Sequence, residues 1–339
     1  MDRITLGDGL MTSPIGFGGM ALTHVYGGID EDAALGVLNA AVDSGVTLID
    51  TADVYGQPKA GAVGPAGTNE ELVSRLLTNR RDEVTLATKF GITGLGSTPD
   101  AKATRGDAAY VRECCDASLR RLGTDVIDLW YLHRRDPEIP VEETVGAMSE
   151  LVAAGKVRHL GLSEVTAAEL RAAHAVRPIA AVQSEWSVWS RDVEAHVVPA
   201  CAELGVGFVP YSPLGRGFLT GTLTREQVSS DVRGRTARMG DNWDVNQRAL
   251  AVVSEVASRL GVTNAQAVLA WLYAAGRRAG VAVAPIPGTR STTRLAENAA
   301  AVDVVLDEDA VAALDSVASL VAGGRNIVAD PTWISAGRE

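Results

Sequence analysis

The chain is poor in cysteine, in aromatic residues and in long apolar runs. Only three cysteines occur in 339 residues, with no CxxC spacing, so neither a disulfide framework nor a metal site is predicted. No apolar stretch approaches the about 20 residues that a transmembrane helix needs. The N-terminus lacks the basic and apolar segments of a secretory signal. These absences predict a cytoplasmic protein with reduced thiols.

Positive charge is also scarce. Lysine and arginine number 31 against 42 acidic residues, which gives a net charge of −11, and no basic run is present. This balance argues against binding to nucleic acid or to an anionic membrane. An apolar fraction of 46% provides material for a large core, and α/β barrels of this length fold as one domain. We therefore expect a single domain over residues 1–339.

From about residue 30 onward, short β-rich runs alternate with longer helical patterns. Regular alternation of this kind indicates a parallel sheet covered by helices, and eight strands favour a closed barrel. The predicted fold is α/β, a (β/α)₈ TIM barrel with a hairpin cap at Asp8-Gly9, an extra C-terminal helix and a tail. The predicted strands are 14–21, 46–50, 83–90, 126–133, 157–164, 179–186, 206–213 and 281–288, and the predicted helices are 31–44, 69–79, 108–122, 141–154, 166–175, 193–204, 246–260, 264–276 and 292–301.

Two segments break this rhythm. Residues 56–68 are rich in Gly, Pro and Ala and are expected to form a mobile loop. Residues 215–246 hold five arginines and show no clean periodicity. Loops of that length in a compact domain tend to be functional, so the second segment is a candidate lid.

Ionisable residues end three consecutive predicted strands. Asp50, Lys89 and His133 close these strands, and Tyr55 follows Asp50 by one short turn. Barrel active sites lie at the C-terminal ends of the strands, so these side chains can meet at the mouth. A lysine beside a phenol lowers its pKa, a carboxylate fixes the lysine, and a histidine can orient a carbonyl oxygen. The set is suited to delivering a proton.

Other catalytic patterns are missing. Residues 16–21 formally match GxGxxG/A, but no helix opens at once after them, as a Rossmann fingerprint requires. GxSxG, HExxH and Walker loops are absent as well, which removes the commonest hydrolase and NTPase interpretations.

Several strings in order resemble the aldo-keto reductases over nearly the whole chain. They are IDTADVYG, GTNEELV, LATKF, DLWYLHRRDP, GKVRHLGLSE, VQSEWS, VPYSPLGRGFLTG and IPGTR…RLAEN. TADVYG and SPLGRG are most similar to the branch containing plant perakine reductase and yeast pyridoxal reductase. The resemblance implies that Tyr55 is the proton donor, Lys89 lowers its pKa, Asp50 holds Lys89 and His133 orients the carbonyl.

The resemblance also implies an NADPH site across the barrel mouth. Arg290 and Arg294 flank a predicted helix start, where guanidinium groups suit a 2′-phosphate. NADPH is expected over NADH, but many relatives carry lysine where this chain has Gly288, so the strictness of this preference is left open. The resemblance implies that Ser163 and Gln183 bind the nicotinamide carboxamide, that Tyr211 stacks on the nicotinamide ring, and that the segment after Tyr211 contacts the pyrophosphate. The cofactor residues expected from the resemblance are Gly19, Met20, Asp50, Ser163, Gln183, Tyr211, Ser212, Leu214, Gly215, Arg216, Gly288, Thr289, Arg290, Arg294, Glu297 and Asn298.

The substrate is expected to be a small carbonyl compound in an apolar pocket. Trp333 is a further candidate for its wall, whereas strand alternation turns Trp130 toward the helices. Two alternatives remain open: an NAD(P)-dependent dehydrogenase of sugars or alcohols, and a cofactor-binding regulatory subunit like the potassium-channel β-subunits. A homo-oligomer is compatible with the acidic surface. The predicted pocket residues are Met20, Tyr26, Tyr55, His133 and Trp186.

Overall fold

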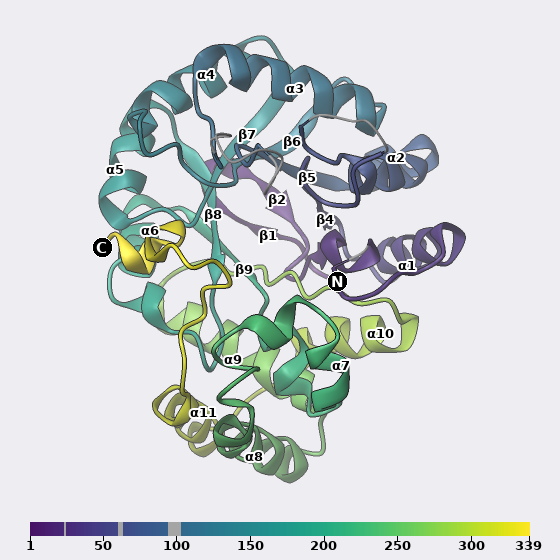
Figure 1. Ribbon diagram of the computed structural model, residues 1–339, viewed down its shortest axis with the longest axis vertical. Coiled ribbons are helices and arrows are strands. Elements are labelled where there is room, and N and C mark those ends of the chain that lie inside the picture. Colours follow the sequence, from purple (N-terminus) through teal and green to yellow (C-terminus); the bar gives the residue numbers. More distant parts are fainter. Residues whose placement is uncertain (24, 60–63, 94–102) are drawn as a thin grey trace.

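The computed structural model describes residues 1–23, 25–59, 64–93 and 103–339 (Figure 1). Seven parallel strands form one sheet in chain order, β3 to β9, and a separate antiparallel pair lies at the N-terminus. The predicted barrel architecture is confirmed. The strands are β1 (Ile4–Thr5), β2 (Met11–Thr12), β3 (Phe17–Gly18), β4 (Leu48–Asp50), β5 (Thr85–Phe90), β6 (Ile127–Leu132), β7 (Val157–Ser163), β8 (Ile179–Glu185) and β9 (Gly207–Tyr211).

The eighth predicted strand, 281–288, closes the barrel without forming a regular ladder. On the β9 side, the Phe208 N–H donates to the Ala282 carbonyl, and the Phe208 carbonyl accepts from the Ala284 N–H. On the β3 side, Gly16 N–H donates to the Pro285 carbonyl over 2.9 Å. Two prolines in this segment cannot donate to a ladder, which keeps its pairing short.

Helices cover the outside of the barrel in a ring (Figure 1). Their starts follow the local sequence: Asp30 and Asp107 accept backbone N–H groups at two N-caps, and Thr166 forms a capping box with Glu169. No helix in the described part of the chain is long and apolar enough to cross a membrane. The helices are α1 (Glu31–Asp43), α2 (Thr68–Arg80), α3 (Ala108–Leu122), α4 (Val141–Ala153), α5 (Ala167–Val176), α6 (Val197–Leu204), α7 (Arg225–Ser229), α8 (Trp243–Leu260), α9 (Asn264–Ala279), α10 (Thr292–Ala300) and α11 (Glu308–Ser316).

The N-terminal hairpin closes the bottom of the barrel. Leu6 and Leu10 belong to the cluster of side chains inside the barrel, and the hairpin lies across the centre of the ring in Figure 1. The connection is longer than the two-residue turn predicted, because a short 3₁₀ turn occupies residues 7–9 between the strands. Asp8 and Gly9 both have positive φ, as an Asp-Gly turn favours.

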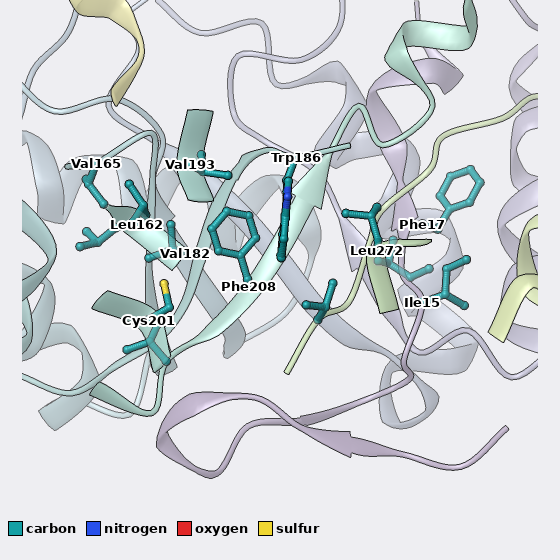
Figure 2. Packing of buried hydrophobic residues seen from close by; sticks show 14 of the residues in the cluster. Ile15, Phe17, Leu162, Val165, Val182, Trp186, Val193, Cys201, Phe208 and Leu272 are labelled. Atoms are coloured by element: carbon teal, nitrogen blue, oxygen red, sulfur yellow. The ribbon is translucent and has the colours of Figure 1, made fainter. Parts of the chain in front are cut away.

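Buried apolar side chains fall into a small inner cluster and a large outer one. The inner cluster fills the barrel below the site, while the outer one lies between the sheet and the helices. Trp130 stacks on Phe90 in the outer cluster with ring centroids 4.2 Å apart, which confirms its predicted direction. Figure 2 shows Trp186 in this outer layer beside Phe208.

The region expected to be an irregular lid is largely folded. The 3₁₀ turns at 215–220 and 232–235 and the helix α7 occupy it, and α8 starts three residues earlier than predicted. Arg233 and Arg238 are buried there, Arg233 with neighbouring Asp231 and Arg238 with Ser190, 48 positions away, and neither pair leaves a periodic signal. Of the mobile loop predicted over 56–68, residues 60–63 lie outside the described residues.

Asp128 joins three parts of the barrel bottom. Its buried carboxylate accepts from the Leu86 backbone N–H over 2.8 Å and forms ion pairs with Arg81 and Arg158. Asp128→Ala is expected to lower the free energy of unfolding by about 3 kcal/mol, because it leaves a buried N–H and a half-buried guanidinium unpaired. Urea unfolding measures this loss, with the exposed Asp244→Ala as the matched control. A midpoint equal to that of the wild type would contradict it.

Candidate active site

Four ionisable side chains converge at the C-terminal ends of β4, β5 and β6. Lys89 Nζ lies 2.5 Å from Asp50 Oδ1 and 3.2 Å from the Tyr55 hydroxyl. The Tyr55 and His133 rings meet edge to face with centroids 5.7 Å apart. Lys89 also donates to the Thr51 carbonyl, so all its donors are directed at the segment that carries Tyr55. The structure therefore brings together the four residues that the strand ends predict.

Burial and mutual charge set the protonation of this group. Burial disfavours the Lys89 ammonium, but Asp50 and Tyr55 oppose it, and the net effect raises the Lys89 pKa. For Tyr55, burial raises the pKa above its ordinary value, and the nearby Lys89 ammonium offsets only part of this increase. The expected approach of the Tyr55 pKa to neutrality is thus not seen, because desolvation outweighs the nearby ammonium. Tyr55 is a protonated phenol at neutral pH.

His133 is a neutral imidazole in this setting. Burial, followed by the positive charges of Arg134 and Lys89, holds its pKa well below the usual value. A neutral imidazole carries one N–H donor, so His133 can hydrogen-bond an oxygen without competing with Tyr55 as the acid. Its ring lies edge to face against the Tyr55 ring, so the two side chains are neighbours in the site.

The segment that carries Tyr55 is anchored from two sides. Asn69, near the start of α2, accepts from the Thr51 hydroxyl over 2.6 Å and donates to the Gly19 carbonyl over 2.9 Å. Glu70 beside it is fully buried and pairs with Arg121 and the Thr88 hydroxyl. These bonds fix the turn between Asp50 and Tyr55, as a catalytic side chain requires.

Arg134 is a site residue that the strand-end argument missed. It donates to the carbonyl of His133 and, over 3.1 Å, to the Ser163 hydroxyl. Its guanidinium faces the Trp333 ring at 5.6 Å, which brings the C-terminal segment to the mouth. The only sequence signal was its place directly after His133 at a strand end.

The residues expected at the nicotinamide end also lie at the mouth. Ser163 pairs in register with Gln183, and Tyr211 ends β9 on the inner face. Gln183 donates its amide N–H to Asp50 Oδ2 over 2.8 Å. Gln183 thus supports the Asp50–Lys89 pair, a contact that the sequence did not predict.

The turn after β9 has an unusual backbone. Ser212, Gly215, Arg216 and Gly217 all have positive φ. A Cβ at Gly215 would lie 2.5 Å from the Trp189 ring, so the close approach requires glycine. Half-buried Leu214 precedes it. Turns of this kind can bind a phosphate through backbone N–H groups, although the Gly215 and Gly217 N–H groups here donate to the Ser212 and Leu214 carbonyls.

Arg216 does not project freely from that turn. Its guanidinium pairs with buried Glu185 over 2.8 Å, with side-chain exposures of 9% and 0%. Glu185 also accepts from the Ser190 hydroxyl. The contact of Arg216 with a pyrophosphate stays a prediction, and its internal ion pair could not be predicted from the sequence because the partners lie 31 residues apart.

At the other end of the mouth, α10 begins with a free cation. Ser291 caps the helix by accepting from the Arg294 N–H, and the exposed Arg294 guanidinium has no ion pair with any residue that the structure describes. Arg290, in contrast, donates to the carbonyls of Gly27 and Gly28 over 3.0 and 3.2 Å. Thr289 and Asn298 are buried beside them, and Glu297 is half-buried.

Gly288, where many relatives are expected to carry lysine, packs against β3. A Cβ there would lie 2.6 Å from the Gly18 carbonyl oxygen, and a Cβ at Gly18 would lie 2.7 Å from the Ile286 carbonyl. Because neither glycine has a Cβ, β3 and the segment 281–288 can approach each other closely here. Glycine is therefore a packing requirement in this barrel.

The candidate pocket residues separate into two groups. Met20 is half-buried, and Tyr26 is half-buried against the Arg233 guanidinium, 4.9 Å from its ring centroid. Trp186 is 1% exposed, packs on Phe208 and Trp271, and donates its indole N–H to Glu194. The expectation that Trp186 lines the pocket is not supported, because its ring fills the outer core (Figure 2).

With this geometry established, comparison with known proteins identifies the class. The Aldo/keto reductase family model matches residues 14–319. The chain belongs to this family and is an oxidoreductase of the kind that interconverts carbonyls and alcohols.

Individual relatives agree with this assignment. A probable aldo-keto reductase 1 from Glycine max is 42% identical over 323 residues, which cover 94% of this chain and 89% of that protein. A thermostable aldo-keto reductase solved with the inhibitor epalrestat has a TM-score of 0.72 at 27% identity, covering 94% of this chain and all of that one. Glycerol dehydrogenase from Gluconobacter oxydans has a TM-score of 0.80 at 25% identity, covering 93% and 94% of the two chains.

Proposed function

We propose that this chain is an NADPH-dependent carbonyl reductase that converts aldehydes or ketones to alcohols, with Tyr55 as the proton donor. One observation carries the proposal: the Tyr55 hydroxyl is held 3.2 Å from a buried lysine, and the Tyr55 ring meets the His133 ring edge to face at the mouth of the barrel. A protonated phenol beside a fixed cation is suited to protonating an oxygen on which negative charge develops.

The roles of the four side chains follow from their contacts. Tyr55 gives its proton to the carbonyl oxygen, and the Lys89 ammonium stabilises the phenolate that this leaves. Asp50 and Gln183 keep Lys89 in place and charged. The N–H of neutral His133 orients the carbonyl oxygen toward Tyr55. Bound NADPH would supply the hydride.

The residues along the mouth fit such a cofactor. Tyr211 offers an aromatic ring at the inner face, Ser163 a hydroxyl, and the turn at 212–217 a concave backbone. The Arg294 guanidinium at the start of α10 suits a 2′-phosphate, because helix N-termini and guanidinium groups both bind phosphate. Arg290 is engaged with the backbone at 27–28, so Arg294 carries the proposed preference for NADPH.

This assignment predicts the effect of removing one charge. Arg294→Ala should raise the Kd for NADPH by about tenfold or more while leaving the Kd for NADH within about twofold, since only NADPH carries the 2′-phosphate. Fluorescence titration measures both constants. Arg277→Ala, at an exposed arginine near the end of α9, is the matched control. An unchanged ratio of the two constants in Arg294→Ala would remove the phosphate role.

The same site can run in the opposite direction, as a dehydrogenase of polyols or sugars. The likeness to a glycerol dehydrogenase favours keeping this second candidate. A rate panel of aldehydes, ketones, sugars and polyols with NADPH, NADH and their oxidised forms separates the two. The proposal expects the largest kcat/KM for an aldehyde with NADPH. A polyol with an oxidised cofactor at the top of the panel would favour the dehydrogenase.

A further inference from the structure

Glu164, the residue directly after β7, is a buried carboxylate that binds three separate parts of the chain. Its side chain is 0% exposed, and its φ of 52° is unusual for a residue other than glycine. The Tyr211 hydroxyl at the end of β9 donates to Oε1 over 2.9 Å. Arg325 of the C-terminal segment donates to both oxygens over 2.8 and 2.9 Å, and Ser335 donates through its N–H and its hydroxyl.

Arg325 keeps this carboxylate charged. Burial would raise the pKa of Glu164, but the Arg325 guanidinium, foremost among several donors, lowers it to about 2. Arg325 is itself 4% exposed, and its Nε and Nη2 groups also donate to the Asp192 carboxylate. An ionised carboxylate accepts only, so the Tyr211 hydroxyl must donate, and its ring is held at both ends.

This carboxylate stands next to the proposed nicotinamide end of the cofactor site. Ser163 precedes it in the chain, and Tyr211 lies on the inner face of the barrel. The C-terminal segment runs from α11 to the side of α5, where the Arg338 guanidinium donates to the Glu164 carbonyl and to Glu169 (Figure 1). The C-terminal segment and the Tyr211 ring therefore share one buried acceptor.

We propose that Glu164 is a positioning residue that fixes the Tyr211 ring for the nicotinamide, and that Arg325 couples docking of the C-terminal segment to this task. The inference rests on the proposed function and extends it to the tail of the chain. The alternative is that Glu164 only docks the C-terminal segment. In that case its bonds affect folding stability, and their loss does not selectively weaken binding of the nicotinamide end of the cofactor.

Two ligands of different length distinguish these roles. NADP⁺ reaches both ends of the proposed site, whereas 2′,5′-ADP lacks the nicotinamide and reaches only the adenosine end. Tyr211→Phe keeps the ring and removes the hydroxyl that Glu164 holds. We expect it to raise the Kd for NADP⁺ by about threefold to tenfold, the range for one ordinary hydrogen bond, and to leave the Kd for 2′,5′-ADP unchanged.

Arg325→Lys tests the coupling without deleting the charge. It loses the two-pronged contact and should weaken NADP⁺ but not 2′,5′-ADP. The double variant Arg325→Lys, Tyr211→Phe should be no weaker than Tyr211→Phe alone, because both changes act through the same bond. Tyr273→Phe removes a comparable hydroxyl bond, to the Pro14 carbonyl, and is the matched control. Arg294→Ala should weaken both ligands.

Titration of each purified variant, with its urea midpoint measured alongside, decides the matter. Selective weakening of NADP⁺ in Tyr211→Phe and in Arg325→Lys supports the proposal. Wild-type NADP⁺ binding in Tyr211→Phe, or equal weakening of both ligands in Arg325→Lys, overturns it and leaves a docking role. A wild-type protein that binds neither ligand would instead overturn the proposed function, and this inference with it.

Discussion

Replacing Tyr55 by phenylalanine is expected to lower kcat for NADPH-dependent aldehyde reduction by about 10²- to 10⁴-fold, the usual contribution of a general acid. The ring remains against His133, so the pocket keeps its shape. Only the hydroxyl 3.2 Å from Lys89 is lost. Turnover of 4-nitrobenzaldehyde, followed by NADPH absorbance, measures the effect.

Cofactor binding is the internal control for this variant. The residues proposed to hold NADPH do not include the Tyr55 hydroxyl, so the Kd for NADPH should stay within about twofold of the wild type, a change below 0.5 kcal/mol. Tyr273→Phe, whose hydroxyl donates to the Pro14 carbonyl and to no residue of the site, should retain wild-type turnover. Undiminished turnover in Tyr55→Phe would assign the proton to another group.

Lys89→Met is expected to lower kcat by about 10²-fold or more, because the ammonium that stabilises the Tyr55 phenolate disappears. Lys89 opposes the effect of burial on the Tyr55 pKa, so its removal raises that pKa further and makes the phenol a weaker acid. The variant also leaves Asp50 buried with Gln183 as its remaining side-chain partner. We expect a loss of about 3 kcal/mol in the free energy of unfolding.

Asp50→Asn separates the two consequences of Lys89→Met. It preserves the size of the side chain and the Lys89 ammonium beside Tyr55, so its effect on kcat should be smaller than that of Lys89→Met. Steady-state kinetics and urea unfolding of both variants make the comparison. A Lys89→Met enzyme with kcat within about threefold of the wild type, under 1 kcal/mol of transition-state energy, would contradict the role of the ammonium.

The chemical centre could be predicted from the sequence because local rules place its residues. Alternation fixes which face of a strand a residue occupies, and parallel strands in a barrel align their C-terminal ends. Counting residues along the strands therefore predicts the positions of Asp50, Lys89 and His133. In the structure these three residues form one cluster with Tyr55. The same alternation correctly predicts that Trp130 points outward, toward the helices.

Long-range polar partners could not be predicted in this way. Arg216 with Glu185, Gln183 with Asp50, and Arg325 with Glu164 join residues 31, 133 and 161 positions apart. No periodicity encodes such pairs, since they depend on how loops fold over the barrel. The prediction that Trp186 lines the pocket is not supported for a related reason. The residue directly follows a strand end, yet its ring lies in the outer layer.

The most direct test of the account follows a label through the reaction. NADPH carrying deuterium at C4 of the nicotinamide, on the face that the enzyme uses, is incubated with 4-nitrobenzaldehyde and the purified wild-type chain. The account predicts one deuterium on the alcohol carbon of each product molecule and no detectable product with Tyr55→Phe in the same time. Alcohol without deuterium, or labelled alcohol formed equally fast by both proteins, would contradict it.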